Sequence, residues 1–347
     1  MTTTDSNQAP ADAAKRPAEC PLRILTVTNM YPAVDRPIMG TFVAEQVTSL
    51  RARGHTVDVL FIDGPASTWN YLRGPAALGD ALRVADYDLI HAHYVFSGLI
   101  ARVQRRLPIV VTHHGIETQQ GWTAPLCRLI SHLADATIAT SPIVAAGLRL
   151  PDVTILPCGV DTELFRPVSK REARGKLGLE PVEPLILFLG QSRPEKRLPL
   201  IEAAVTQLIS IVPSARLLKV YDQPREAIPL YLNAADVLVL ASIAEGSPMA
   251  VREAMACNLP VVCTDVGDVK ILFNNLPGHF LLPCPPKRSD ILGYTAGEAD
   301  ALAAQLATAL AFDGRTTGRK RILPWSLAAV AEKIESLYRA VLQRHWA

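Results

Sequence analysis

The sequence predicts an α/β protein of two domains, each built on a parallel sheet with helices on both faces. Short apolar runs rich in β-branched residues alternate with segments of helical periodicity, as in parallel sheets that are buried on both sides. The chain has 347 residues, more than one hydrophobic core usually supports. A charged, proline-flanked stretch at 164–183 separates two blocks that each begin with an apolar strand. We therefore expect two domains with a cleft between them.

The first block begins with a strand, a helix and a second strand. An apolar run at 22–28 precedes a loop and a segment of helical spacing at 42–55, where Gly54 ends the helix. The next apolar run, at 56–62, completes a βαβ unit. Further strands are expected at 88–93, 108–114, 136–140 and 153–157.

The second block restarts with a strand at 184–190 and a helix from Leu198 that Pro213 ends. Later strands are expected at 215–221, 236–242 and 259–265, with a short helix at 252–257. The organisation that we expect is a disordered tail at 1–20, a domain at 21–167, a linker at 168–183, a domain at 184–325 and a C-terminal helix at 326–347 that could pack back on the N-terminal domain.

The composition is that of a globular protein with sizeable cores. Hydrophobic residues make up 49% of the chain and charged residues 20%, and the net charge is +2. This balance argues against general binding of nucleic acid, which needs a strongly basic face. The six cysteines form no Cys-x-x-Cys pair and show no metal-ligand spacing, so we expect reduced thiols in a cytoplasmic protein.

Membrane-spanning or export segments are not expected. The first twenty residues are polar and lack the apolar stretch of a signal peptide, and no apolar run approaches eighteen residues. Any membrane contact would be peripheral, at the inner membrane face. Three basic residues could make such a contact with anionic lipid, or could simply form a solvated helix face: Arg102, Arg105 and Arg106.

Residues just after each strand are the candidates for ligand binding, because ligands bind at the carboxyl ends of parallel strands. Gly40, shortly before the first helix, could let the backbone approach a phosphate, or could be a simple turn glycine. The string EGSPMAVREAMACNLPVVCTDVGDV places Glu245 in a loop and Glu253 on the helix after Pro248. Unpaired N–H groups at this helix start suit a pyrophosphate, and a carboxylate one turn later suits two ribose hydroxyls. The alternative is that both glutamates are exposed charges.

That string resembles the Glu-x7-Glu signature of the retaining glycosyltransferases of family 4, the group 1 glycosyltransferases of the GT-B fold. Other family motifs follow in order over most of 22–275: RILTVTNMYP, DLIHAHYVFSG, PIVVTHHG, ILPCGVDTELFRP, PEKR and LYLNAADVLVLAS. The chain looks most like the bacterial surface-polysaccharide and teichuronic-acid-type branch. The resemblance implies two Rossmann-like domains with parallel sheets that face a central cleft.

The resemblance also implies roles on the donor side. Glu253 would hold the donor ribose, and Glu245 would contact the transferred sugar. Lys196 matches the lysine of a basic pair that neutralises the leaving diphosphate, whereas Gln191 stands at the arginine position and cannot supply that charge. Arg193 is a nearby substitute. The backbone of five further residues would cradle sugar and diphosphate: Gly246, Ser247, Pro248, Met249 and Ala250.

On the other domain, His114 of the THHG segment matches the family histidine beside the reacting sugar. His91 and His93 share one face of their strand, and we interpret them as mainly structural, with His93 a minor site candidate. Metal ligation by these histidines is a weaker alternative, because no carboxylate partner has the required spacing. Cys158 replaces the asparagine of the family's Asn-Gly-Val-Asp turn, and Glu117 replaces its nearby aspartate.

The function implied by the resemblance is transfer of a hexosyl unit from a nucleotide-diphosphate sugar to a hydroxyl of a saccharide or lipid-linked acceptor, in polysaccharide or glycoconjugate biosynthesis. Configuration would be retained, no cofactor would be needed beyond the donor substrate, and no metal motif is visible. Alternatives are a nucleotide-sugar epimerase or phosphorylase of the same fold, or a catalytically weak nucleotide-sugar-binding subunit, which Gln191 motivates.

Overall fold

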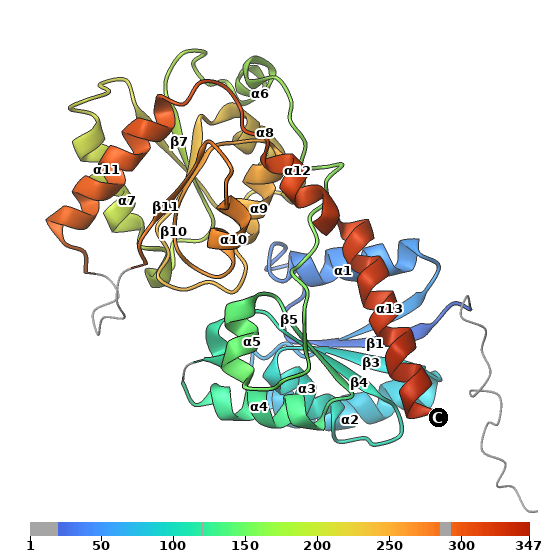
Figure 1. Cartoon of the computed structure of the whole chain (residues 1–347). Helices are drawn as coiled ribbons and strands as arrows, with labels where there is room; N and C mark the ends of the chain where they lie inside the picture. The colour runs from blue at the N-terminus through green and yellow to red at the C-terminus, as the bar shows by residue number, and fades with distance from the viewer. Residues whose placement is uncertain (1–19, 120, 285–292) are drawn as a thin grey trace, which may run out of the picture.

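The computed structural model describes residues 20–119, 121–284 and 293–347, and these form two α/β domains, each around one parallel sheet (Figure 1). The tail expected at 1–20 lies outside the described residues except for Cys20. The predicted fold class is confirmed. A short apolar strand and an amphipathic helix alternate through both halves, because each strand needs helices to cover its two faces.

The N-terminal sheet has six strands in the order β2-β1-β3-β4-β5-β6, all parallel. Its strands lie where the apolar runs predict them: β1 Arg23–Thr28, β2 Thr56–Phe61, β3 Leu89–His93, β4 Ile109–His113, β5 Ala136–Ala139 and β6 Val153–Ile155. The helices that cover it are α1 Thr41–Ala52, α2 Trp69–Val84, α3 Val95–Ala101, α4 Thr123–Leu133 and α5 Pro142–Leu148. Every residue of β3 and β4 is buried, as expected for central strands covered on both faces.

The C-terminal sheet has five parallel strands in the order β11-β10-β9-β7-β8. They are β7 Leu185–Leu189, β8 Arg216–Val220, β9 Val237–Leu240, β10 Val261–Thr264 and β11 His279–Leu282. The helices around it are α7 Leu198–Leu208, α8 Ile228–Ala234, α9 Met249–Ala256, α10 Val269–Phe273 and α11 Ala296–Leu310. Sequence analysis did not identify β11, α10 or α11.

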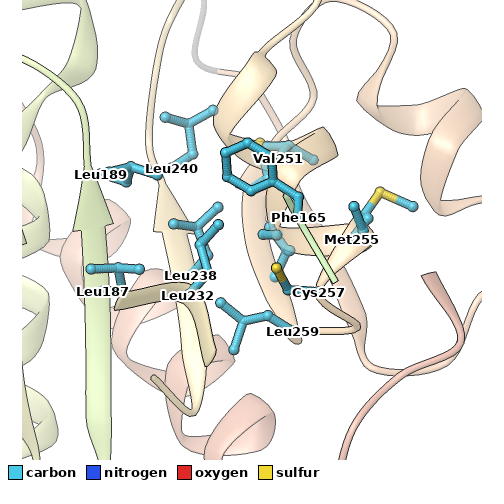
Figure 2. Close-up of a cluster of buried hydrophobic side chains, with 14 of the residues drawn as sticks. Phe165, Leu187, Leu189, Leu232, Leu238, Leu240, Val251, Met255, Cys257 and Leu259 are labelled. Atoms are coloured by element: carbon cyan, nitrogen blue, oxygen red, sulfur yellow. The ribbon is translucent and has the colours of Figure 1, made fainter. Parts of the chain in front are cut away.

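One core of the C-terminal domain anchors the helix that carries Glu253. Val251 and Met255 of α9 are fully buried among the leucines of β7 and β9 (Figure 2). Phe165 packs into the same cluster, although the predicted boundary placed it in the N-terminal domain. Because large side chains hold α9 on one side, the position of its polar residues is set by the core.

The expected linker at 168–183 contains a helix, α6 (Lys170–Leu177), that packs against α8. Ser169 caps its start, and its Arg174 is buried. The Arg174 guanidinium donates to the carbonyl oxygens of Ala234, Glu180 and Pro181 and to Asp236 at distances of 2.7–3.0 Å. The sequence predicts that Arg174 is an exposed charge in a linker, but the side chain is buried and hydrogen-bonded. The segment around it is therefore part of the C-terminal domain.

The C-terminal end of the chain returns to the first domain through α12 (Gly318–Ile322) and α13 (Leu327–His345), the long red helix of Figure 1. Val330, Ile334 and Val341 of α13 share a buried cluster with Ile24 of β1. The chain therefore crosses between the domains twice, and the two crossing segments pair where Val160 donates to Trp325 and accepts from Leu327. Among the described helices, none is both long and apolar enough to cross a bilayer.

Candidate active site

The strand orders place a crevice in each domain. In the N-terminal sheet the order reverses between β1 and β3, and in the C-terminal sheet between β7 and β9. Such a switch point opens a crevice at the carboxyl ends of the two strands. His93 ends β3, while Gly190 and Ser242 follow β7 and β9. Several of the predicted site residues belong to the strand ends and loops at these crevices.

Gly246 lies at one of the contacts between the two domains. A Cβ atom at this position would overlap the carbonyl oxygen of His114. Gly267, which has a left-handed φ of 59°, packs on the same loop, and a Cβ added there would lie 2.5 Å from the Gly246 carbonyl oxygen. Only glycine fits here, and the loop that carries Glu245 is therefore pressed against the end of β4.

Glu245 and Lys196, both named from the sequence, form an ion pair. The Lys196 Nζ lies 2.6 Å from Glu245 Oε1, and the Ser242 hydroxyl donates to the same oxygen at 2.9 Å. The two side chains are only 11% and 15% exposed, so water screens the pair weakly. Lys196 belongs to the 3-10 helix η3 (Pro194–Lys196) beyond β7, and its charge is paired with Glu245.

Glu253 is nearly inaccessible and faces an arginine that sequence analysis missed. Its side chain is 5% exposed, and Oε1 accepts a hydrogen bond of 2.6 Å from Nη1 of Arg225. Burial raises the pKa of Glu253, and Arg225 opposes that rise. Arg225 directly follows the loop at the carboxyl end of β8, and that position is the signal that could have identified it.

The start of α9 is held by a second buried ion pair. Arg252 of α9 pairs with Asp268, which precedes α10. Ser247 joins them, since its hydroxyl accepts from Arg252 Nε at 2.7 Å and donates to Asp268 at 3.2 Å. The side chain of Ser247 is therefore used inside the protein, while the helix N-terminus after Pro248 presents the backbone of Met249 and Ala250.

His114 sits in a stack of aromatic rings with both ring nitrogens in contact with protein atoms. Its Nε2 lies 2.9 Å from Nδ1 of His93, and its Nδ1 lies 3.5 Å from the Cys158 sulfur. The ring centroids of Phe42 and Tyr94 each lie 4.8 Å from the centroid of the His114 ring. Burial lowers the pKa of His114 well below its usual value and that of His93 to about 3, so both imidazoles are neutral at pH 7.

The remaining residues of this strand end orient the histidines. His91 is buried and bonds to Tyr338 of α13 and Thr112 of β4 at 2.6 and 2.7 Å, which is a structural arrangement. The Glu117 carboxylate accepts from the backbone N–H groups of His114 and Gly115, at 3.1 Å each. Glu117 thus shapes the THHG turn from within its own domain.

Three predicted donor-side residues lie apart from these contacts. Gln191 is exposed, and Arg193 pairs with Glu195 at 3.2 Å with its side chain 57% exposed. Gly40 caps α1 with a left-handed φ of 71°, and a Cβ there would overlap the backbone of Met30. The structure therefore gives Gly40 a packing role in the loop after β1.

A cavity of about 690 Å³ lies at the junction of the two domains. It lies between α1 and the two segments that cross between the domains, and Glu45 and Arg225 stand in its wall. No group of three His, Cys, Asp or Glu side chains is arranged to hold a metal ion in the parts of the chain that the structure describes.

Both halves of the chain match glycosyltransferase families. Residues 39–164 match the model described as Glycosyltransferase Family 4, and residues 211–311 match the model described as Glycosyl transferases group 1. These matches confirm the family resemblance found in the motifs.

Two curated relatives carry related descriptions. TuaC of Bacillus subtilis, described as a teichuronic acid biosynthesis glycosyltransferase, is 29% identical over 236 residues, which are 59% of this chain and 59% of that protein. The D-inositol 3-phosphate glycosyltransferase of Segniliparus rotundus is 27% identical over 235 residues, 53% of this chain and 52% of that protein. The match thus spans between half and three-fifths of the length of each relative.

Solved structures share the fold. Sucrose-phosphate synthase from Thermosynechococcus elongatus superposes with a TM-score of 0.75 at 22% identity, over 93% of this chain and all of that one. Anabaena HepE in complex with UDP and glucose gives a TM-score of 0.60 at 17% identity, over 93% of this chain and 98% of that one. The two facing parallel sheets are those of the GT-B fold, as the sequence predicts.

Proposed function

We propose that this chain transfers a hexosyl unit from a nucleotide-diphosphate sugar to an acceptor hydroxyl with retention of configuration. Its two halves match the models of the family 4 and group 1 glycosyltransferases, which supports this reaction class. The observation that carries the proposal is the contact at Gly246. There the loop between Glu245 and the N-terminus of α9 meets the backbone of His114 across the cleft. We assign the groups nearest this contact in the chain to one site: Glu245 and its partner Lys196, the N-terminus of α9, and His114.

The donor would bind on the C-terminal side. Glu253 would accept hydrogen bonds from the ribose hydroxyls, and the N–H groups of Met249 and Ala250 would face the diphosphate, where the helix end favours negative charge. HepE, which has the same fold, has been solved with UDP and with UDP-glucose. We take a nucleotide-diphosphate sugar as the donor substrate, with no further cofactor.

In the reaction, the bond between the anomeric carbon and the diphosphate oxygen breaks, and a bond to the acceptor oxygen forms on the same face. The acceptor proton passes to the leaving diphosphate. Lys196 would move from Glu245 toward the developing phosphate charge, which leaves Glu245 to contact the sugar. The neutral imidazole of His114 would exchange its long contact with the Cys158 sulfur for a sugar hydroxyl, and domain closure would keep water out.

The acceptor would be a saccharide or a lipid-linked saccharide in polysaccharide or glycoconjugate biosynthesis. The descriptions of the two relatives, an inositol phosphate and a teichuronic acid enzyme, support an acceptor rich in hydroxyls. A lipid-linked acceptor would bring the protein to the inner face of the cytoplasmic membrane. Arg105 and Arg106, both exposed, would contact the anionic surface there.

The test is product analysis with a panel of UDP, GDP and ADP sugars and hydroxyl acceptors. We expect a glycosylated product whose anomeric configuration, read by NMR, matches the donor. An isomerised nucleotide sugar would instead show an epimerase, and a free sugar phosphate a phosphorylase. Donor binding without turnover on any acceptor would show a binding subunit.

Two variants separate binding from chemistry. Glu253→Gln should weaken binding of the donor nucleotide, because a neutral amide accepts fewer hydrogen bonds from hydroxyls than a carboxylate does. Glu245→Gln should lower kcat by at least about tenfold with the nucleotide affinity kept. Glu202→Gln, an exposed glutamate on α7, is the control and should behave as the wild type.

A further inference from the structure

Arg225 joins the two domains beside the glutamate that we assign to the donor ribose. Its Nη1 donates to Glu253 Oε1 at 2.6 Å, and its Nε and Nη2 donate to the two oxygens of Glu45 at 2.7 and 3.2 Å. Glu45 lies on α1 of the N-terminal domain, and Glu253 lies on α9 of the other domain. All three side chains are 20% exposed or less, so these are partly desolvated ion pairs.

The guanidinium is also fixed from one side by packing. Its carbon lies 4.5 Å from the centroid of the Phe165 ring, and Phe165 is fully buried in the core beneath α9. Arginine presents its donors in a rigid planar fork, which can bind two carboxylates in different directions at once. Core packing thus sets the orientation of the fork.

We propose that Arg225 is a positioning residue for the donor: it orients the Glu253 carboxylate toward the ribose and ties that carboxylate to the N-terminal domain through Glu45. The inference rests on the ribose-binding role proposed above for Glu253. Oε1 of Glu253 is held by Arg225, and we assign the second oxygen of this carboxylate, Oε2, to the ribose hydroxyls.

The charge of Arg225 matters because Glu253 is buried against another acid. Two charged groups act on it: Arg225 after β8 and Glu45 from α1. Burial and the nearby Glu45 raise the pKa of Glu253, and only Arg225 lowers it. Removing Arg225 would leave two carboxylates facing each other, and Glu253 would take up a proton. A protonated carboxyl loses acceptor capacity for ribose hydroxyls.

The experiment measures how well the full chain distinguishes ribose from deoxyribose. Isothermal titration gives Kd for UDP, GDP and ADP and for their 2′-deoxy counterparts, at pH 7 and pH 9. We expect the wild type to bind one ribonucleotide at least about tenfold more tightly than its deoxy form, since a hydrogen bond to a charged group is lost. In Arg225→Gln this ratio should fall below about threefold at pH 7 and recover toward the wild-type ratio at pH 9, as Glu253 ionises.

Two further variants keep the test decisive if Arg225→Gln folds poorly. Arg225→Lys keeps the charge but cannot span both carboxylates, so the ratio should persist at pH 7 while kcat for glycosyl transfer falls. Glu45→Gln should likewise keep the ratio and lower kcat, because it loosens only the link between the domains. Arg216→Gln, an exposed arginine paired with Glu183, is the matched control and should change neither quantity.

The outcomes separate this inference from the proposed function. If the wild type distinguishes ribose from deoxyribose and Arg225→Gln does so equally at both pH values, Arg225 does not position Glu253 and the inference alone is overturned. Arg225→Lys that matches the wild type in both ratio and kcat also overturns it. Wild-type protein that binds no nucleotide of the panel, or binds both sugars equally, overturns the role of Glu253 itself.

Discussion

At the residue scale, the site is defined by close backbone contact and by charges that already have partners. Gly246 lets one domain touch the other at His114, and Lys196 pairs with Glu245 at 2.6 Å. Folding has already fixed these charges in position and removed much of their water. They therefore need little reorganisation when a reaction begins. In the proposed reaction, the donor diphosphate would replace Glu245 as the partner of Lys196.

Gly246→Ala tests the contact between the domains. The added methyl would overlap the His114 carbonyl, so the domains could not close and kcat should fall at least about a hundredfold, since misplacement of about 1 Å can cost that much. Steady-state kinetics and the melting temperature provide the measurement. Gly175→Ala is the control, because a Cβ at that helical glycine meets nothing within 4 Å. Unchanged kcat in Gly246→Ala would contradict the closed arrangement.

His279 provides a prediction on pH dependence. Neither of its ring nitrogens has a hydrogen-bond partner in the described structure, and burial lowers its pKa to about 4. Between pH 6.5 and 4 the unfolded chain binds a proton at this histidine that the native chain does not bind, so stability falls as the pH falls. The loss attributable to His279 should reach roughly 3 kcal/mol at pH 4. Urea unfolding of His279→Leu from pH 7.5 to 4.5 should show a shallower decline than the wild type, and an equal decline would refute this origin.

At the element scale, short helices and loops place the site residues, and buried polar groups hold those elements down. The N-terminus of α9 is fixed by Arg252, Ser247 and Asp268, and the THHG turn is fixed by Glu117. Helix α6 is held in the same way by Arg174. Each of these groups is costly to bury alone and becomes structural only once its partners surround it.

Arg174→Ala tests whether α6 is part of the C-terminal domain. Removal of this guanidinium leaves three carbonyl oxygens without this donor and Asp236 with only Lys170 and the Leu185 N–H, so the free energy of unfolding should fall by about 3 kcal/mol. Chemical denaturation followed by circular dichroism measures it. The exposed Arg171 of the same helix gives the control, Arg171→Ala, with a change within about 0.5 kcal/mol. A similarly small effect at Arg174 would show that α6 is only a linker.

At the scale of the whole molecule, two crossings of the chain hold the sheets face to face. Helix α13 packs on the first domain, and the crossing segments pair at Val160. The ion pairs of Arg225 add a third link near the donor side. With the donor role proposed for Glu253, closure and donor binding would be coupled through these residues.

Metal removal tests how this cleft would neutralise the leaving diphosphate. Lys196 and the N-terminus of α9 are the cationic elements of the proposed site. We expect glycosyl transfer to persist with excess EDTA at no less than about half of its rate, because these groups would stabilise the charge. Abolished transfer that Mg²⁺ or Mn²⁺ restores would overturn this expectation.

Local patterns in the sequence were enough to predict the class of fold, most strands and the first helix of each domain. A buried strand needs a continuous apolar run, and an amphipathic helix needs apolar residues every three to four positions. Both patterns can be recognised within a short stretch of sequence. The ends of these runs also indicated where His114, Glu245 and Glu253 would lie, because parallel strands collect their loops at one edge. Strand β11 and helix α11 were missed, and α6 was taken for a linker, because those segments depend on what packs against them.

Only the tertiary structure decided which side chains form ion pairs with one another. The pairing of Lys196 with Glu245 joins residues 49 positions apart, and that of Arg225 with Glu45 joins residues 180 apart. The sequence by itself determined which residue types lie at the strand ends, whereas their contacts arise only when two cores hold two sheets at a set distance. Ion pairs and hydrogen bonds depend on distances of a few ångströms between side chains. The number of residues between two side chains in the sequence does not give that distance.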